Sequence, residues 1–449
     1  MKELFIERDG FLRIARVEDG VLKALKVIKD TDKPAKGDIY SGIIRNVSKS
    51  QGAAFIDIGT GKNAYLHMRK TKENQALHVG DSIAVEVLRG ETGGKGAKVT
   101  DRISLTNGNL VVMKGKGYSF SKHTKPADFY AIHDKISPIP GMRLMIRSES
   151  LNLSPERFKK EMEQLVQKFQ EICRKADQRV SPKRLYRDLG YLDELLEDVS
   201  SDEALLVHSN DTLMSEALRE RGQTQITDYP PSFHVFHRHG LESTVERLRN
   251  KTLQMPGGGS LVIEETEALI AIDVNSGSHR GQGKKLNSLE LNRVALKLAL
   301  EQIELRNLAG IIIIDFVTMD DPEDGIKLFQ EAKSLTQGKK PLTKVYPLTE
   351  LGLLQIARRR EGESVTSLLF GRDSRQKLLV SATYLYKLIR IRLDDEVWDM
   401  NRFEVSLNPI YQLEQQAIEK LLSIDYPDLE IRVVTRSEVD LVKVVPVLL

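Results

Sequence analysis

The sequence contains almost no cysteine and no long hydrophobic run. Its single cysteine, Cys173, cannot form an intrachain disulfide or a zinc site of several thiolates, and we expect it to be a buried thiol on a helix. The most apolar stretch, 310–317, has the length of a strand, whereas a membrane span needs about 20 apolar residues. The N-terminus also lacks the apolar core of a signal peptide. We therefore expect a cytoplasmic protein without membrane contact.

The composition is that of a globular chain of several domains. Hydrophobic residues make up 40% and charged residues 29% of 449 residues, which predicts about three or more folded units. The net charge is only +3, but residues 89–125 hold eight lysines and arginines against two acidic residues, a local +6. We interpret this segment as a contact for a polyanion, with an ordinary solvated loop as the alternative.

Short apolar segments separated by turns predict a small barrel near the N-terminus. Residues 1–34 contain candidate strands, and further short strands follow over about seventy residues, as in a small closed barrel. Alternation in AAFIDIG directs Phe55 outward, and Tyr65 of the next strand can join it. Exposed aromatic rings beside lysines stack on the bases of single-stranded RNA. The alternative is that both rings cap the barrel. The segment resembles the OB-fold domain of RNA-binding proteins.

Two later segments have a clear pattern. GMRLMIRSES (141–150) reads as a strand ending at Arg147 and Ser148, which can hold a phosphate, although a surface salt bridge is the alternative. Residues 155–179 predict an amphipathic helix with Ser154 as its N-cap. Three histidines in SFHVFHRHG lack matching acidic or cysteine partners, so we interpret them as a strand-to-loop element: His234, His237 and His239.

The strongest chemical signal lies between residues 253 and 320. Two predicted strands, SLVIEE and ALIAID, precede a turn that contains Asn275. A helix at about 287–306 follows, and then IIIID, which reads as a buried strand. Strands joined through a helix lie parallel, so Asp273 and Asp315 emerge at one edge of the sheet. Paired carboxylates suit Mg²⁺ or Mn²⁺, and such a cation promotes attack on a phosphodiester. Asn275 can donate a hydrogen bond to a phosphate oxygen.

This segment resembles the catalytic segment of the bacterial ribonuclease E/G family. The matching text is TEALIAIDVNSG followed by IELRNLAGIIIIDFVTMD, and the family's catalytic residues carry over as Asp273, Asn275 and Asp315, with both aspartates as metal ligands. The resemblance implies a multidomain α/β fold. Its parts are an RNase H-like scaffold (1–34 and 186–248), an inserted OB-fold barrel (35–107), a 5′-sensor-like region (108–185), a DNase I-like catalytic domain (249–365) and a small C-terminal α+β domain (366–449).

The resemblance also implies how RNA is bound. Two sets of residues carry over: Phe55, Tyr65 and Lys95 for the RNA strand, and Arg147, Ser148 and Lys344 for a 5′-phosphate. The expected activity is a metal-dependent endoribonuclease that cuts single-stranded RNA to 5′-phosphate and 3′-hydroxyl ends, in rRNA processing or mRNA decay. Two alternatives stay open, a non-catalytic RNA-binding protein of the same fold and a DNA nuclease.

The sequence departs from the family pattern in three places. The family's Cys-Pro-x-Cys motif, through which two chains share a zinc ion, is absent. We therefore expect no zinc, and any homodimer would form through the catalytic and C-terminal domains without it. Lys284 and Lys285 stand where the family is usually acidic. The segment 114–130 is shorter than the family's 5′-sensing loop, and Lys344 is the best candidate for a basic residue at 342–344.

Overall fold

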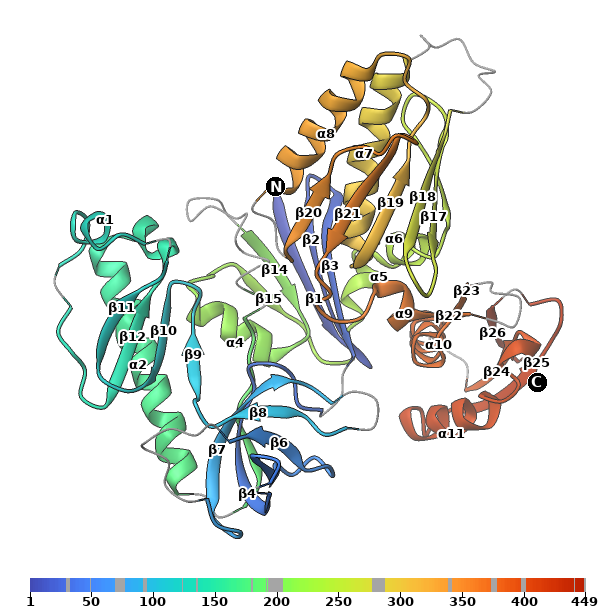
Figure 1. The fold of residues 1–449 in the computed structure, drawn as a ribbon. Helices are drawn as coiled ribbons and strands as arrows, with labels where there is room; N and C mark the ends of the chain where they lie inside the picture. The colour runs from blue at the N-terminus through green and yellow to red at the C-terminus, as the bar shows by residue number, and fades with distance from the viewer. Residues whose placement is uncertain are drawn as a thin grey trace. The chain divides into compact units, whose positions relative to one another are not determined.

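The chain folds into two compact units in a computed structural model (Figure 1). Residues 1–30 and 199–449 form the first unit, and residues 31–198 form the second. Among the helices of the described residues, none is both long and apolar enough to cross a membrane. The structure describes residues 1–29, 33–48, 50–68, 77–91, 95–122, 124–134, 136–178, 181–190, 192, 205–276, 287–337, 341–372, 378–396, 401–439 and 441–447.

The first unit contains a scaffold sheet built from two distant chain segments. Its strand order is β15-β14-β1-β2-β3, with β1 parallel to β14 and antiparallel to β2. The strands are β1 (Lys2–Arg8), β2 (Phe11–Glu18), β3 (Val21–Lys29), β14 (Leu205–Ser209) and β15 (Ile226–Asp228), and the helices that follow them are α4 (Thr212–Glu220), α5 (Val235–Arg238) and α6 (Glu242–Arg247). The strands predicted within 1–34 are thus confirmed.

A second sheet of the same unit carries the segment with the paired aspartates. Its order is β16-β17-β18-β19-β21-β20. Its elements are β16 (Thr252–Gln254), β17 (Ser260–Glu265), β18 (Ile270–Asn275), α7 (Ser288–Leu305), β19 (Gly310–Asp315), α8 (Pro322–Thr336), β20 (Thr343–Tyr346) and β21 (Leu353–Arg358). The predicted helix is confirmed: it begins after Asn287, which forms a reciprocal capping box with Glu290.

Helices α7 and α8 cover one face of this sheet (Figure 1). Ile312 and Ile314 of β19 are fully buried beneath them, whereas Ile311 is 58% exposed. The prediction that IIIID is a buried strand therefore holds only for the face beneath the helices. Asp273 and Asp315 lie on the opposite face, which the helices do not cover, and both are exposed.

The C-terminal part of the first unit mixes helices and strands. Strand β24 lies between β25, which is parallel to it, and β26, which is antiparallel. The elements are α9 (Val365–Leu369), β22 (Phe370–Arg372), β23 (Leu378–Val380), α10 (Ala382–Glu396), β24 (Arg402–Leu407), η2 (Pro409–Tyr411), α11 (Gln415–Asp425), β25 (Glu430–Thr435) and β26 (Val442–Pro446). Their apolar side chains share one core with the scaffold sheet.

The second unit begins with the predicted barrel. Its order is β13-β4-β5-β6-β8-β7, and pairing of β4 with β7 closes the sheet. The strands are β4 (Ile39–Ser48), β5 (Ala53–Asp57), β6 (Ala64–His67), β7 (Ser82–Arg89), β8 (Lys98–Thr100) and β13 (Lys183–Tyr186). The barrel prediction is confirmed. Beyond β13, the backbone N–H of Asp188 donates to buried Asp38 at 3.0 Å, which fastens this later segment to the barrel.

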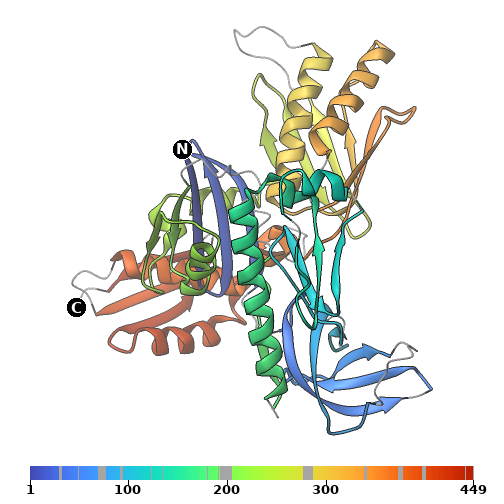
Figure 2. The same ribbon diagram turned by 90° about the vertical axis from the view of Figure 1, so that its left-hand side faces the viewer.

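A sheet of order β11-β12-β10-β9 completes the second unit, with the long helix α2 alongside it (Figure 2). The predicted helix is confirmed, since Ser154 Oγ accepts from the Arg157 N–H at 3.3 Å. Cys173 is half-buried on it, and burial raises the pKa of its thiol. The elements are β9 (Ser104–Thr106), β10 (Leu110–Lys114), β11 (Gly117–Phe120), α1 (Pro126–Tyr130), β12 (Met142–Ile146), η1 (Ser148–Asn152) and α2 (Pro155–Asp177).

Two local expectations are wrong. The histidine segment forms the short helix α5 instead of a strand, because His234 and His237 reach back to carboxylates of α10: Nε2 of each lies 2.7 Å from Asp394 and Asp395 respectively. The sequence pattern predicts residues 97–105 (AKVTDRISL) to be the last of the short barrel strands, but this segment contributes to β8 in the barrel and β9 in the neighbouring sheet. In both cases contacts with distant segments decide the local conformation.

A buried ion cluster joins the scaffold sheet to helices α6 and α10. Arg13 is fully buried, and its guanidinium donates to Glu7 at 2.6 Å and to Glu242 at 2.7 Å. Lys387 of α10 pairs with Glu7 and, at 3.0 Å, with Asp9. Burial alone would raise the pKa of Glu7, but the charges of Arg13 and Lys387 outweigh it and lower that pKa to about 2.

Removal of the central cation of this cluster should destabilise the chain strongly. Arg13→Met leaves the buried carboxylate of Glu242 without its paired cation and leaves Glu7 with Lys387 alone, and we expect a loss of about 3–5 kcal/mol in the free energy of unfolding. The control is Arg219→Met, which breaks an exposed pair with Asp228 and should cost about 1 kcal/mol or less. Urea unfolding of the full chain measures both, and equal losses would contradict the assigned role of the cluster.

Candidate functional site

The two aspartates are direct neighbours on adjacent parallel strands. In the register of β18 with β19, Asp273 is the partner of Asp315, and the strands run in the same direction because α7 makes the crossover between them. The spacing of neighbouring strands places their Cα atoms about 4.8 Å apart. The predicted meeting of both carboxylates at one edge of the sheet is therefore confirmed.

Asn275 belongs to the same surface. It is the last residue of β18 and pairs with Ser260, so the expectation that it lies in a turn is wrong. Its side-chain Nδ2 donates to Oδ2 of Asp273 at 2.7 Å. This bond fixes the direction of the Asp273 carboxylate, and the amide keeps a second N–H for another acceptor.

The carboxylate pair suits a divalent cation in its charge and exposure. Within the described residues, neither Asp273 nor Asp315 forms a salt bridge with a lysine or arginine, so no side-chain cation competes for the pair. The described residues contain no group of three or more His, Cys, Asp and Glu side chains arranged so that it could hold a metal ion. Two carboxylates are nevertheless sufficient for Mg²⁺ or Mn²⁺, because such ions keep several waters and bind substrate oxygens. Lys284 and Lys285 lie outside the described residues.

The barrel of the second unit carries a strip of outward side chains. Phe55 of β5 and Tyr65 of β6 are paired in register, both half-buried, with ring centroids 6.0 Å apart in an edge-to-face arrangement. Tyr65 is in turn the register partner of exposed Lys98 on β8, which the sequence marked only as part of the basic segment 89–125. Lys95 is exposed just before β8. Two rings beside exposed cations suit stacked bases and a phosphate backbone.

The carboxylate of Asp57, which lies beside this strip, is paired with an arginine and so does not repel a bound polyanion. Asp57 ends β5 two residues after Phe55, and Arg45 of β4 binds it with Nη2 at 2.7 Å from Oδ2. The hydrogen bond from Arg45 lowers the pKa of Asp57. The arginine charge therefore neutralises the one carboxylate that shares the outer face of β5.

The three residues expected at a 5′-phosphate lie in different units. Arg147 is half-buried between β12 and η1, and Ser148 follows it with its Oγ donating to Glu149 at 3.3 Å. Lys344 belongs to the first unit, where it is exposed on β20. The structure thus brings Arg147 and Ser148 together, and it puts Lys344 on the sheet of the carboxylate pair.

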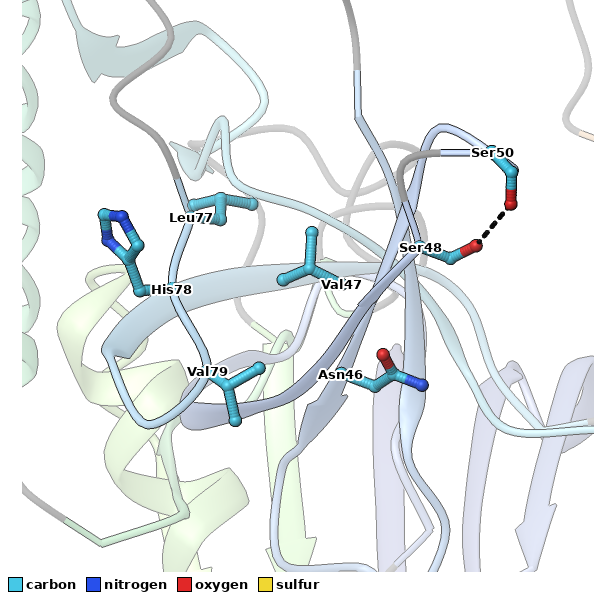
Figure 3. Close-up of a pocket in the computed structure, with 7 residues that line it drawn as sticks. All are labelled: Asn46, Val47, Ser48, Ser50, Leu77, His78 and Val79. Atoms are coloured by element: carbon cyan, nitrogen blue, oxygen red, sulfur yellow. Dashed lines mark hydrogen bonds between the residues drawn. The ribbon is translucent and has the colours of Figure 1, made fainter.

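A hollow on the barrel lies away from these residues (Figure 3). It has a volume of about 650 Å³, and the hydroxyls of Ser48 and Ser50 at its rim are 3.3 Å apart. The side chain of His78 points away from the other lining residues. None of the residues expected to bind RNA lines it, and we assign it no ligand. The lining consists of Asn46, Val47, Ser48, Ser50, Leu77, His78 and Val79.

A barrel with an outward aromatic strip and a sheet with a carboxylate pair define a protein with a nucleic-acid-binding module and a candidate cation centre. Family models match both the sheet segment and the barrel segment of the chain. The chain belongs to the Ribonuclease E/G family, whose model matches residues 104–361, and the S1 RNA binding domain matches residues 33–100. The family match contains Asp273, Asn275 and Asp315, and the S1 match contains Phe55, Tyr65 and Lys98.

Curated relatives carry the same family name. Ribonuclease E of Synechocystis sp. is 28% identical over 77% of this chain and 55% of its own length. Ribonuclease G of Haemophilus influenzae is 26% identical over 80% of this chain and 79% of its own length. Ribonuclease G of Escherichia coli is 23% identical over 88% of both chains. The chain thus spans about half the length of the cyanobacterial ribonuclease E proteins that it matches.

The carboxylate pair predicts a cation site that can be measured without any substrate. We expect Mn²⁺ to bind the full chain, and Asp273→Asn or Asp315→Asn to weaken that binding by about tenfold or more because each removes a ligand charge. Titration followed by electron paramagnetic resonance measures the free ion. Glu323→Gln, which removes an exposed carboxylate at the start of α8, is the control. Binding that survives both aspartate substitutions would place the ion elsewhere.

Proposed function

We propose that the chain is a metal-dependent endoribonuclease that cuts single-stranded RNA to 5′-phosphate and 3′-hydroxyl ends, in rRNA processing or mRNA decay. The observation that carries the proposal is the in-register pair Asp273 and Asp315, with Asn275 bonded to the first, inside the residues that match the family. RNA is favoured over DNA by the S1 match on the same chain.

The proposed site residues of the sheet have two roles, to bind the cation and to orient its ligand and the phosphate. Asp273 and Asp315 would hold Mg²⁺ or Mn²⁺, and a bound cation supplies positive charge against the negative charge that develops on the phosphodiester oxygens. Asn275 orients the Asp273 carboxylate through its 2.7 Å hydrogen bond. Its second N–H is free to donate to a non-bridging phosphate oxygen without adding repulsive charge.

The second unit would supply most of the RNA affinity. Phe55 and Tyr65 stack on unpaired bases, while Lys95 and the neighbouring Lys98 contact phosphates. We further propose that Arg147 and Ser148 receive a 5′-phosphate. Arg147 supports this because none of the described residues forms a salt bridge with its side chain. Its backbone is held in place, since its N–H donates to the carbonyl oxygen of Asn109 at 3.0 Å.

We also propose that a homodimer, where it forms, uses the catalytic and C-terminal domains without a shared zinc. The single cysteine, Cys173, lies in the second unit and cannot supply the two thiolates of such a link. Exposed apolar side chains of α11 and the preceding turn support the C-terminal contact: Leu413 is 93% and Ile424 is 64% exposed.

The central experiment is the cleavage of a short 5′-monophosphorylated, A/U-rich RNA with Mg²⁺. We expect the natural chain to cut internally, and Asp273→Asn and Asp315→Asn to reduce kcat by about 100-fold or more, because a cation contributes several kcal/mol to such reactions. Both variants should still bind the RNA. Glu323→Gln serves as the control and should cut normally.

Other results would point to the alternatives. Binding without cutting by the natural chain, with Mg²⁺ or Mn²⁺, would identify a non-catalytic RNA-binding protein of the same fold. Equal cutting of a deoxyribose strand of the same sequence would identify a nuclease that does not select the sugar.

The barrel strip makes a separate prediction for affinity. Phe55→Ala and Tyr65→Ala each remove one stacking surface, so we expect each to weaken RNA binding by about tenfold. Fluorescence anisotropy with a labelled single-stranded RNA measures the dissociation constant. Leu88→Ala, which shortens a 45% exposed side chain on β7 of the same barrel, is the control. An unchanged affinity in both aromatic variants would rule out this face as the contact.

A further inference from the structure

The edge strand β20 presents an unexplained row of side chains beside the carboxylate pair. Val345 packs on the core beneath α7 and α8, so its neighbours in the strand point to the opposite face. There Lys344 is exposed, Tyr346 is 46% exposed, and Leu342 just before the strand is 60% exposed. Tyr346 does not belong to the core beneath α7 and α8.

The register shows how close this row is to the aspartates. Tyr346 pairs with Gln355 of β21, and Gln355 pairs with Ile313 of β19. Asp315 lies two residues after Ile313 on the same face of β19. Two strand spacings across the sheet and two residues along it separate the Cα atoms of Tyr346 and Asp315 by about 12 Å. Figure 1 shows β20, β21, β19 and β18 side by side in this order.

The surface between Tyr346 and the two aspartates suits a nucleotide. Its floor is formed by Gln355 and Ile313, a polar and an apolar side chain. Among the described residues of β20 and β21 none is acidic, and none forms a salt bridge with Lys344. Exposed Glu264 of β17 shares this face but is paired with Lys251 at 3.0 Å. The unpaired negative charge of the described part of the face therefore lies at Asp273 and Asp315, and the Lys344 ammonium lies to one side of it on β20. A strand of alternating bases and phosphates can meet both.

We propose that Tyr346 and Lys344 form a nucleotide subsite of the carboxylate site. Tyr346 stacks on an unpaired base near the cut, and Lys344 contacts a phosphate of the same RNA strand. The subsite rests on the proposed function and gives Lys344 a role on the catalytic sheet. Both residues position the substrate and neither takes part in bond breaking.

A second copy of the chain is the competing occupant of this face. Packing between copies would bury the Lys344 ammonium against Leu342 and Tyr346, and an unpaired buried charge is costly. A polyanion compensates that charge, which is why the row favours RNA.

The test uses RNAs that each lack one base at a successive position around the cut. With the natural full chain, the abasic position that faces Tyr346 should raise KM by about tenfold. In Tyr346→Ala, KM should already be raised to a similar extent, more than kcat is lowered, and the same abasic position should have no further effect. Tyr346→Phe keeps the ring and should restore the natural pattern. Ile326→Ala, 58% exposed on α8, is the control.

Each result separates the subsite from the proposed function. If no abasic position loses its effect in Tyr346→Ala, the subsite is wrong while the nuclease stands. If Tyr346→Ala instead changes the sedimentation of the RNA-free chain and leaves KM unaltered, the face joins two copies and the subsite is wrong. If the natural chain does not cut, the proposed function fails. The same abasic series, measured as equilibrium binding, then decides the subsite by itself.

Discussion

Burial of only one face of the second sheet determines where the chemistry of this protein can lie. Helices α7 and α8 cover the side chains at alternate positions of each strand, and these fill a continuous apolar core. The positions between them must then face outward, whatever their chemistry, because successive strand side chains alternate between faces. Asp273, Asp315, Lys344 and Tyr346 share one surface for this reason. A helix on the second face would bury two unpaired carboxylates, and that is strongly unfavourable.

The scaffold depends on a different interaction, the buried charges around Arg13. Glu7, Glu242 and Lys387 come from three separate parts of the chain, and each is stable in the interior only because the others are present. Helix α10 is therefore fixed to the scaffold by charges of its own chain. His234 adds a second tie, with Nε2 2.7 Å from Asp394 of the same helix.

Much of the site could be predicted from the sequence because its signals are local. Two apolar segments ending in aspartate, with a capped helix between them, predict parallel strands and neighbouring carboxylates. The same reasoning failed for Ile311, since a run of isoleucines has the same letters whether helices cover one face of a sheet or both. Lys98 was recognised only as one of the eight basic residues of segment 89–125, and Tyr346 was missed because nothing near it in the sequence marks it. The position of each depends on the residue beside it on another strand, Tyr65 for Lys98 and Gln355 for Tyr346.

The sequence by itself predicted the strands within 1–34, the small barrel, the helices at 155–179 and about 287–306, and the resemblance to the ribonuclease E/G family, from which the proposed catalytic residues carry over. These follow from periodicity, caps and motifs, which act over a few neighbouring residues. Only the tertiary structure decided which face of the sheet is open, that Asn275 directs the Asp273 carboxylate, and that the histidine segment is helical. Each of these depends on side chains from distant segments, whose packing and charge pairing outweigh local preference.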